Sequence, residues 1–370
     1  MPKARNIPFI DLSLKKTDLD KTISNISKLI KDKNFIGGNE VENFQENFSK
    51  FNESKYCVGV ANGTDALEIA LESLDIPKNS EVIVPNFTFL SPAEAVVRGG
   101  YKLVLADINL DDFTISIESL KKLVTKKTSA LIVVHLFGNP CDMTAIRKIT
   151  DKYDIKIIED CSQAHGAKFK GKIVGNFGDV GTFSFYPTKN LGAFGDSGAI
   201  VTNKKSLYEK VQKIANHGRV ATYDHVLPGR NSRLDSIQAA VLNFKIKNLN
   251  KQNELRIEQA SYLIKAIKSS NIKTPRLTLG QSSVFHQFPI LSRDRKSLMA
   301  FLRKKGINCG IYYPKPLSKM KAFRNIVSSR KVHSENSKIA SNRIFSLPIG
   351  PHLNIKDSEY IANAIQSFPK

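Results

Sequence analysis

The stretch FSFYPTKNLGAFGDSGAIVTN, residues 183–203, places a single lysine, Lys189, between two runs that are typical of β-strands. The first run, GTFSF, ends at Phe185, and the second, GAIVTN, begins at Gly198. A glycine-rich surface loop rarely continues straight into an apolar strand. The stretch therefore predicts two strands with a lone ammonium group between them, and the question is whether that lysine is solvated or chemically reactive.

Strand-like and helical patterns alternate over the first 200 residues. The expected strands are apolar and rich in β-branched residues: 81–85, 102–107, 130–137, 154–160, 181–185 and 198–203. The expected helices between them cover 64–74, 91–99 and 142–153. Apolar strands that alternate with helices predict an α/β fold with a large, mostly parallel sheet covered on both faces.

The pattern changes after about residue 233, where it becomes long and helical. A shorter mixed segment follows, with strands expected near 285–290 and 306–313 and a terminal helix over 357–368. We therefore expect a large α/β domain over residues 1–240 and a smaller α+β domain over 241–370. Residues 1–25 are able to pack on the smaller domain.

Several classes of protein are excluded by composition. No window approaches the ~18 continuous apolar residues that a membrane helix needs, and the N-terminal stretch MPKARNIPFIDLSLKK lacks the apolar core of a secretory signal. The four cysteines lie far apart and form no CxxC pair, so we expect no zinc or iron–sulfur site. A reduced, cytoplasmic chain is the expectation.

The chain is strongly basic, with 56 Lys and Arg against 34 Asp and Glu and a formal net charge of +22. Nucleic-acid binding is one interpretation. However, the basic residues are spread among acidic residues and asparagines, without an aromatic-interleaved basic run or a basic tail. A solvated basic surface that attracts an anionic small molecule is favoured, although the charge alone does not decide.

Polar residues follow several expected strands. Asp160 ends one of them, Ser184 lies near the end of another, and Asn62-Gly63-Thr64 leads from an apolar run into a helix. Ligands bind beyond the carboxyl ends of strands in open α/β sheets, and the free N–H groups of a helix start suit a phosphate.

Each of these residues also has an ordinary structural explanation when taken singly. Asn62 could be a helix N-cap, Asp160 a turn residue, Phe89 a core residue and Lys189 a solvated lysine. Their order and spacing along the chain favour the functional interpretation.

The chain resembles the pyridoxal-phosphate-dependent nucleotide-sugar aminotransferases of the DegT/StrS type. The resemblance covers nearly the whole length and includes VANGTDALEIAL, VPNFTFLSPAEAV, IIEDCSQAHGA, GRNSRLDSIQAAVL and IYYPKPLSK. The block from Ile158 to Asn203 is highly specific. The resemblance implies an aspartate-aminotransferase-like fold (fold type I), pyridoxal 5'-phosphate as cofactor, and a homodimer with shared active sites.

The resemblance also assigns roles to individual residues. Lys189 is the Schiff-base lysine and the base that moves a proton, and Asp160 is the carboxylate that keeps the pyridine nitrogen protonated. Gln163 matches the glutamine near the cofactor's 3-hydroxyl, and Phe89 matches the aromatic ring stacked on the pyridine.

The remaining matches concern the cofactor's phosphate. Gly63, Thr64 and Ser184 match its cradle, and Asn231 matches an asparagine that reaches the phosphate in the neighbouring subunit. The chain departs from many relatives at Tyr312 and Ser318, positions often held by histidine in a region expected near the sugar. These departures leave the substrate's identity open, but they do not affect the cofactor residues.

The implied reaction is amination of a nucleotide-diphosphate-linked 3- or 4-keto sugar, with L-glutamate as amino donor. Two alternatives stay open at this point. A sugar dehydratase of the same fold would lack the lysine and carry an iron–sulfur cluster. A non-catalytic basic binding or regulatory homologue would carry a degraded set of cofactor residues, whereas the set in this sequence is complete.

Overall fold

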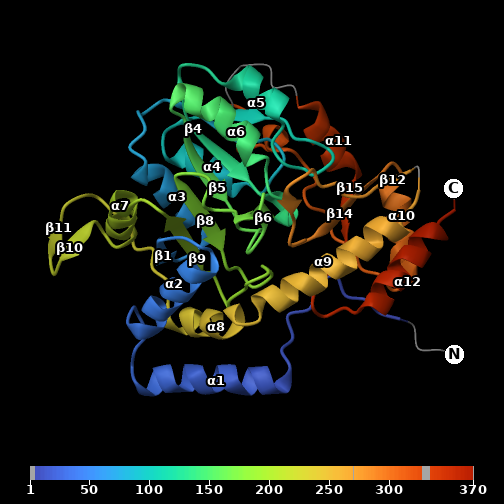
Figure 1. Cartoon of the computed structure of the whole chain (residues 1–370), viewed down its shortest axis with the longest axis horizontal. Coiled ribbons are helices and arrows are strands. Elements are labelled where there is room, and N and C mark those ends of the chain that lie inside the picture. Colours follow the sequence, from blue (N-terminus) through green and yellow to red (C-terminus); the bar gives the residue numbers. More distant parts are fainter. Residues whose placement is uncertain (1–4, 270, 327–333, 370) are drawn as a thin grey trace.

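The computed structural model describes residues 5–269, 271–326 and 334–369. In Figure 1 a large sheet-containing part and a smaller part are joined by the long helix α9, Leu249–Ala266. Within the described residues, no helix is long and apolar enough to cross a bilayer.

A seven-stranded sheet forms the centre of the larger part, in the order β1-β9-β8-β5-β4-β2-β3. Its strands are short and mostly buried: β1 Tyr56–Val60, β2 Glu81–Pro85, β3 Lys102–Ala106, β4 Thr128–Val134, β5 Lys156–Asp160, β8 Val180–Ser184 and β9 Gly198–Thr202. The pairs β3-β2, β2-β4, β4-β5 and β5-β8 are parallel, whereas β9 is antiparallel to both of its neighbours. The prediction of a mostly parallel α/β sheet is confirmed.

The reversed direction of β9 shapes the loop that holds the lone lysine. Ser184, the last residue of β8, pairs with Gly198, the first of β9. The loop 185–197 between them therefore leaves and re-enters the sheet at the carboxyl ends of the parallel strands. Ligands bind at this edge in open sheets.

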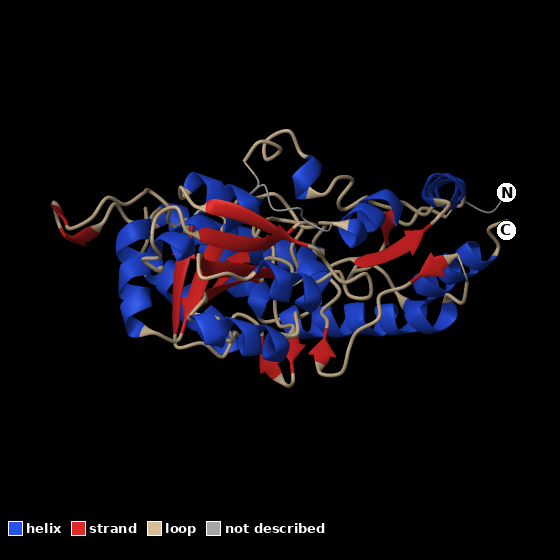
Figure 2. Ribbon diagram, turned by 90° about the horizontal axis from the view of Figure 1, so that it is seen from above, coloured by secondary structure: helices blue, strands red, loops and turns tan. Residues whose placement is uncertain are grey.

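Helices cover both faces of the sheet (Figure 2). Successive side chains of a strand point to opposite faces, and because these side chains are apolar, both faces need cover. On one face, the apolar sides of α3 (Gly63–Ser73), α4 (Ser91–Arg98) and α7 (Lys205–Ala215) bury side chains such as Val82 and Val84.

The other face is covered by four helices: α2 Asn39–Phe51, α5 Ile117–Leu123, α6 Met143–Thr150 and α8 Ser236–Ile246. The helices α5 and α6 pack over Ile83, whereas α2 and α8 pack over Phe183. Alternate residues of one strand thus supply two separate cores, which holds the sheet rigid beneath its edge.

The smaller part is built on a three-stranded antiparallel sheet, β12 (Ile272–Lys273), β14 (Phe288–Ser292) and β15 (Ile344–Leu347). Helices pack around it: α9, α10 Arg295–Lys304, α11 Glu335–Arg343 and α12 Ile355–Gln366. The terminal helix and a strand close to 285–290 are confirmed.

The predicted strand at 306–313 is wrong. Two residues of this segment form isolated bridges, Ile307 with Ile7 and Gly310 with Ser346. The two bridging partners belong to distant segments of the chain, so no continuous ladder forms.

The N-terminal segment contacts both parts of the molecule. Ile7 is buried in the core of the smaller part, and its N–H donates to the carbonyl of Gly306 at 2.8 Å. Helix α1, Lys16–Lys31, instead packs against α8 of the larger part. The expected division near residue 240 falls inside α8 and stays a prediction.

Three small strands, β6 (Lys168–Phe169), β7 (Lys172–Ile173) and β13 (Gln281–Ser282), form a separate sheet. The hairpin of β10 (Arg219–Ala221) and β11 (Asp224–His225) projects from the left edge of the molecule in Figures 1 and 2.

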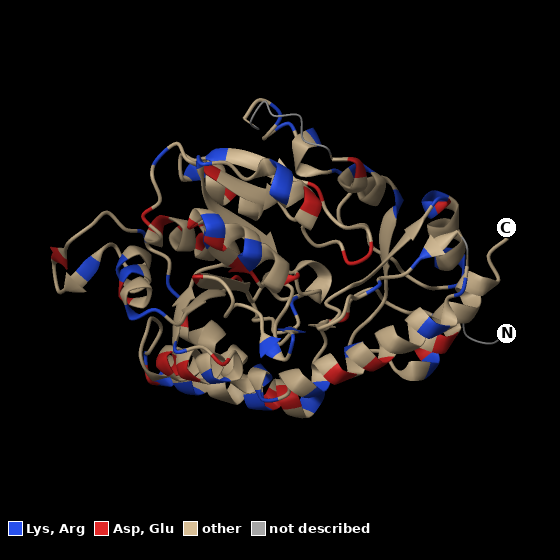
Figure 3. Ribbon diagram, turned by 45° about the horizontal axis from the view of Figure 1, so that its top comes forward, with Lys and Arg blue, Asp and Glu red and all other residues tan. Residues whose placement is uncertain are grey.

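Charged residues of both signs are spread along the ribbon (Figure 3). Several exposed lysines pair with carboxylates, for example Lys50 with Glu46 and Lys121 with Glu118, at 2.7 Å in each case. This mixture is typical of a solvated basic surface rather than of a continuous basic groove.

Candidate active site

A pocket of about 1070 Å³ lies at the carboxyl edge of the central sheet. It is lined by strand ends and loops of the larger part, by α9 and residues 286–287, 349 and 351–352 of the smaller part, and by the N-terminal residues 9–14. Seven predicted site residues line it: Gly63, Thr64, Phe89, Asp160, Gln163, Ser184 and Lys189. The structure thus brings together residues that are far apart in the sequence.

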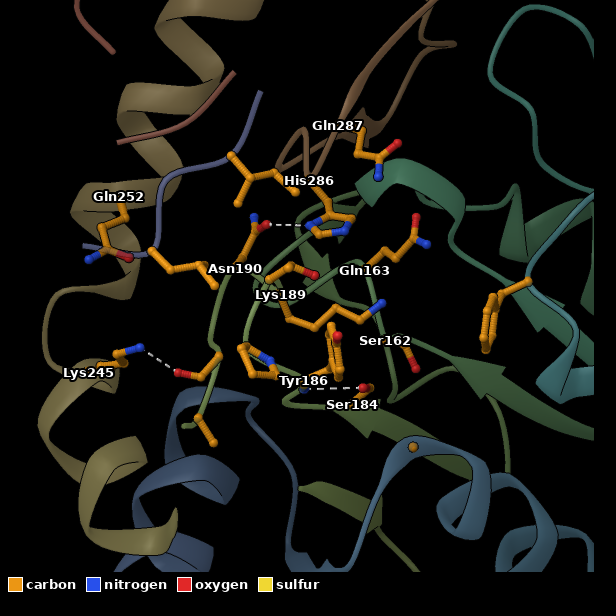
Figure 4. A pocket seen from close by; sticks show the side chains of 18 of the residues that line it. Ser162, Gln163, Ser184, Tyr186, Lys189, Asn190, Lys245, Gln252, His286 and Gln287 are labelled. Atoms are coloured by element: carbon orange, nitrogen blue, oxygen red, sulfur yellow. Dashed lines mark hydrogen bonds between the residues drawn. The ribbon is translucent and has the colours of Figure 1, made fainter. Parts of the chain in front are cut away.

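Lys189 lies in the loop after β8, where its backbone N–H donates to the carbonyl of Tyr186 at 2.8 Å. Its side chain extends into the pocket toward Gln163 and Ser162 (Figure 4). Desolvation lowers the pKa of Lys189 from 10.5 to about 8, and the negative charge of Asp160 opposes this shift. About a tenth of the amine is then unprotonated at pH 7, and the unprotonated form is the one that a nucleophile or base requires.

Asp160 ends β5, and only 6% of its surface is exposed. Its Oδ1 accepts a hydrogen bond from the backbone N–H of Ser162 at 3.0 Å. Burial raises the pKa of Asp160, while the hydrogen bonds from Ser162 and the charge of Lys189 oppose the rise. A buried carboxylate of this kind gains most from a cationic partner, such as a protonated ring nitrogen.

A saturated polar cluster lies directly behind Asp160. His135 Nδ1 accepts from the N–H of Cys141 at 3.0 Å, so its Nε2 carries the proton and donates to Glu159 Oε2 at 3.0 Å. Glu159 also accepts from the backbone N–H groups of Gly175, Phe177 and Gly178.

His135, Glu159 and Cys161 lie close enough together to suggest a metal site. However, both ring nitrogens of His135 and both carboxylate oxygens of Glu159 already have partners. Burial also raises the pKa of Cys161, which disfavours the thiolate that a metal requires. The cluster serves to fix the end of β5.

The start of α3 forms a narrow cradle beside β8. Asn62 caps this helix, because its Oδ1 accepts from the N–H of Asp65 at 2.8 Å. A Cβ atom on Gly63 would lie 2.7 Å from the Cβ of Ser184, so only glycine permits this close approach. The free N–H groups of the first helical turn face this space, which suits a phosphate.

Thr64 and Ser184 place hydroxyl groups at the same cradle. Thr64 Oγ1 and Ser91 Oγ lie 2.7 Å apart, and Ser184 Oγ accepts from the N–H of Tyr186 at 3.3 Å. These bonds orient two hydroxyls that can donate to an anion.

Gln163 and Phe89 line the pocket and both contact Tyr313. Gln163 Oε1 accepts from the N–H of Phe137 at 2.7 Å, and its Nε2 donates to the hydroxyl of Tyr313 at 3.1 Å. Phe89 is 49% exposed, and its ring lies 6.1 Å from that of Tyr313. An aromatic ring this exposed inside a pocket is available to stack on a planar ligand.

Asn231 is the predicted site residue that does not line this pocket. It is exposed and forms an isolated bridge with Asn216, at the base of the β10–β11 hairpin. Within one chain it therefore has no place at the cofactor residues.

The two departures from the family pattern separate in the structure. Tyr312 lines the pocket and stacks on Phe9 with ring centroids 5.9 Å apart. Ser318 does not line it, and its N–H donates to Asn86 Oδ1 at 2.9 Å. Of the two, only Tyr312 is placed to contact a ligand.

The described residues fit pyridoxal 5'-phosphate. The Gly63 cradle, which a Cβ would fill, suits the phosphate; the buried Asp160 suits a protonated ring nitrogen; and Lys189 suits an aldehyde carbon. When bound, this cofactor supplies an electron sink that stabilises negative charge at a substrate carbon.

Sequence analysis missed several residues that line the same pocket: Asn190, Lys245, Arg256, His286 and residues 9–14. Asn190 is next to Lys189 and could have been noticed from its position. His286 and Arg256 carry no local signal, because the FHQFPI run indicates a strand and Arg256 lies in a long helical pattern.

Comparison with known proteins gives a consistent result. The model of the DegT/DnrJ/EryC1/StrS aminotransferase family matches residues 17–366. A UDP-N-acetyl-3-dehydro-alpha-D-glucosamine 3-aminotransferase from Acidithiobacillus ferrooxidans is 37% identical over 361 residues, which cover 97% of each chain. A protein from Geobacillus stearothermophilus described as a pleiotropic regulatory protein is 36% identical over 367 residues, which cover 98% of each chain.

Solved structures match equally well. The crystal structure of DesV from S. venezuelae aligns with a TM-score of 0.94 and 34% sequence identity, covering 98% of both chains. This similarity extends over both parts of the molecule.

Proposed function

The chain belongs to the DegT/DnrJ/EryC1/StrS family of pyridoxal-phosphate-dependent sugar aminotransferases, and from that premise we propose the reaction that it catalyses. It transfers the amino group of L-glutamate to the 3- or 4-keto group of a nucleotide-diphosphate-linked sugar. The product is an amino sugar for a polysaccharide, another glycan or a secondary metabolite.

One observation carries this proposal: an amine with a pKa of about 8 and a buried carboxylate line the same pocket. With the cofactor bound, Lys189 Nζ would hold it and would serve as the base that moves a proton at the substrate carbon. Asp160 would keep the ring nitrogen protonated, because a buried carboxylate is stabilised by a cation beside it. Gln163, Phe89 and the Gly63 cradle orient the ring and its phosphate.

The size and lining of the pocket support a large anionic substrate. A volume of about 1070 Å³ lies slightly above the usual range of about 300–1,000 Å³ for small-molecule sites. Tyr186, Phe194 and Tyr312 line it beyond the cofactor residues and offer aromatic surface for a sugar or a base. The net charge of +22 favours approach of a nucleoside diphosphate.

The two alternatives are disfavoured by the same residues. A dehydratase of this fold lacks the Schiff-base lysine, whereas Lys189 lies in the pocket. A regulatory homologue would not need the cofactor residues, yet seven of them line one pocket of this chain. The similarity to a protein described as regulatory therefore does not outweigh the site.

We also propose a homodimer with shared active sites. Tyr223 at the tip of the hairpin is 93% exposed, and Val220 and Val226 are about half exposed. Helix α1 leaves Leu19, Ile23 and Ile30 exposed. Apolar surface of this extent is typical of an interface, and a second copy that covers it would receive Asn231 near its own cofactor phosphate.

The cysteines support a cytoplasmic location. Cys57, Cys141, Cys161 and Cys309 are all free thiols in the structure. Free cysteines are typical of a reducing compartment.

Absorption spectroscopy and a substrate panel test the proposed function. The purified protein should bind pyridoxal 5'-phosphate with a visible or near-visible band, and borohydride should fix the cofactor covalently to Lys189. UDP-, dTDP- and GDP-linked keto sugars should then be assayed with glutamate. A protein that binds the cofactor but aminates none of these sugars would contradict the proposed substrate class.

A further inference from the structure

A hydrogen-bond chain behind Lys189 determines the proton positions of a histidine in the pocket. Asn190 Nδ2 donates to the backbone carbonyl of Val284 at 3.2 Å and to Asn253 Oδ1 at 3.0 Å. A carbonyl oxygen can only accept, so the orientation of the Asn190 amide is fixed. Its Oδ1 faces His286 Nδ1 at 3.0 Å and must accept a hydrogen bond from it (Figure 4).

The proton of His286 is therefore on Nδ1, and its Nε2 carries a lone pair. His286 is 8% exposed and lines the pocket. Burial and the positive charges of Lys189 and Arg256 lower the pKa of His286 well below its ordinary value, so the ring stays neutral. The pocket thus contains a fixed hydrogen-bond acceptor beside the reactive lysine.

Arg256 lies close to this histidine, in α9. Its Nη1 donates to the backbone carbonyls of Phe285, His286 and Ile349 at 3.2–3.4 Å. Within the described ranges, no carboxylate lies within 4.0 Å of its guanidinium, although the residue lines the pocket. Desolvation lowers the pKa of Arg256 to about 10, so it is still a cation at neutral pH.

A guanidinium that is held by carbonyls and has no carboxylate partner is prepared to bind an anion. The neighbouring acceptor on His286 suits a group that carries N–H bonds. A zwitterionic α-amino acid offers both groups, a carboxylate and an ammonium, on the same carbon atom. The ionised oxygens of a diphosphate only accept hydrogen bonds, so a diphosphate bound to Arg256 would not itself donate to the His286 lone pair.

We propose that Arg256 and His286 form the subsite for the amino donor: Arg256 binds its carboxylate, and His286 Nε2 accepts a hydrogen bond from its ammonium group. Asn190 is a positioning residue that holds the histidine in the required tautomer. The inference rests on the proposed aminotransferase function and adds the residues that recognise the donor.

The test compares two anions that share oxyanion chemistry, glutarate and UDP, each titrated calorimetrically into the cofactor-loaded protein. Arg256→Met keeps the length of the side chain and removes its charge. It should weaken glutarate binding by about tenfold to a hundredfold, since bonds to charged groups contribute ~1.5–3 kcal/mol. UDP affinity should change by less than about threefold.

Lys245→Met is the matched control, because Lys245 is a cation of the same pocket whose amine already donates to the Gly192 carbonyl at 2.7 Å. It should leave glutarate binding unchanged. Weaker UDP binding with unchanged glutarate binding in Arg256→Met would assign the arginine to the diphosphate and overturn the proposal. Unchanged affinity for both anions would overturn it as well.

A measurement on the unaltered protein avoids any problem of folding. Phenylglyoxal modifies accessible arginines, and peptide mass mapping shows which ones. Glutarate should protect Arg256 from modification and UDP should not; protection by UDP alone, or by neither, would contradict the subsite.

The role of His286 has its own readout. His286→Phe should raise KM for glutamate by about tenfold and leave KM for the sugar nucleotide within about threefold. His286→Gln offers an amide oxygen near Nε2 and should restore part of the loss. A change in kcat alone would contradict the role. If the unaltered enzyme did not respond spectrally to glutamate, the aminotransferase function itself would fail, independently of these variants.

Discussion

The strand ends around Asp160 and the β10–β11 hairpin around Tyr223 differ in how much of their environment the chain itself supplies. Asp160 is 6% exposed, and the saturated His135–Glu159 pair lies behind it. Tyr223 is 93% exposed at the tip of the projecting hairpin, and Asn231 at its base lies outside the pocket.

This difference separates two kinds of site residue. The geometry of Lys189, Asp160 and the Gly63 cradle follows from contacts within one chain, so it is complete in a single copy. In the proposed homodimer, the position of Asn231 relative to a cofactor depends on a second copy. Variants in the two regions should therefore fail in different ways.

The largest expected effect is that of Lys189→Ala. Turnover should fall by at least about a thousandfold, because both the covalent attachment and the proton transfer are lost. Borohydride should no longer fix the cofactor to the protein, as judged by mass spectrometry. Lys245→Ala is the control and should keep the covalent link. If Lys189→Ala turned over substrate nearly as fast as the unaltered protein, the mechanism would be refuted.

Asp160→Asn should retain the fold and bind the cofactor but lose more than about nine-tenths of its activity, a change of at least ~1.4 kcal/mol in the barrier. The reason is that a neutral amide does not keep the ring nitrogen protonated. Steady-state rates at saturating glutamate and sugar nucleotide measure the loss. A smaller loss would indicate that Asp160 is only structural.

Mixing Lys189→Ala with Asn231→Asp tests the contrast directly. If Asn231 serves the partner's site, one site of each hybrid dimer carries both defects and the other carries none. An equal mixture should then regain up to about a quarter of normal activity, since half of the dimers are hybrids with one working site. Neither variant alone should show this activity.

If Lys189 and Asn231 of the same chain instead serve one site, every site of the hybrid carries one defect and the mixture stays inactive. The aspartate is chosen because a carboxylate beside a phosphate repels the cofactor. Size-exclusion chromatography of each variant is the control for dimer formation.

The smallest effect concerns pH. With a pKa of about 8, Lys189 is neutral above that pH and increasingly protonated below it. The initial rate at which the apoprotein captures the cofactor should therefore fall by about tenfold per pH unit below pH 8 and level off above it. Stopped-flow absorbance measures this rate.

The same lysine gives a second pH signature. Its pKa is lower in the folded than in the unfolded chain, so the unfolded chain binds more protons between about pH 8 and 10.5. The free energy of unfolding contributed by this group therefore rises across that window.

Asp160→Asn should move the midpoint of cofactor capture to lower pH, because it removes the charge that raises the pKa of Lys189. An unmoved midpoint would show that the two groups do not interact.

The sequence predicted the sheet because its strands are short, apolar and separated by helices, and it predicted Asp160, Ser184 and Lys189 because the three lie within one specific block. It could not predict Arg256 and His286, which come from a helix and a strand start that meet only in three dimensions. The wrong strand at 306–313 has the same cause, since its bridges depend on Ile7 and Ser346.

The pairing of β1 with β9 has a consequence for synthesis of the protein. β1 lies at the edge of the sheet, and its neighbour there is β9, so Val60 finds its partner only when Gly198 is available. Chains leave the ribosome from the N-terminus, and such distant pairings form late. The β1–β9 ladder therefore forms only after residue 202 has emerged, and a nascent chain stalled before that point should leave β1 unpaired. Until then β1 is an apolar strand with an unpaired edge, the kind of segment that chaperones protect during translation.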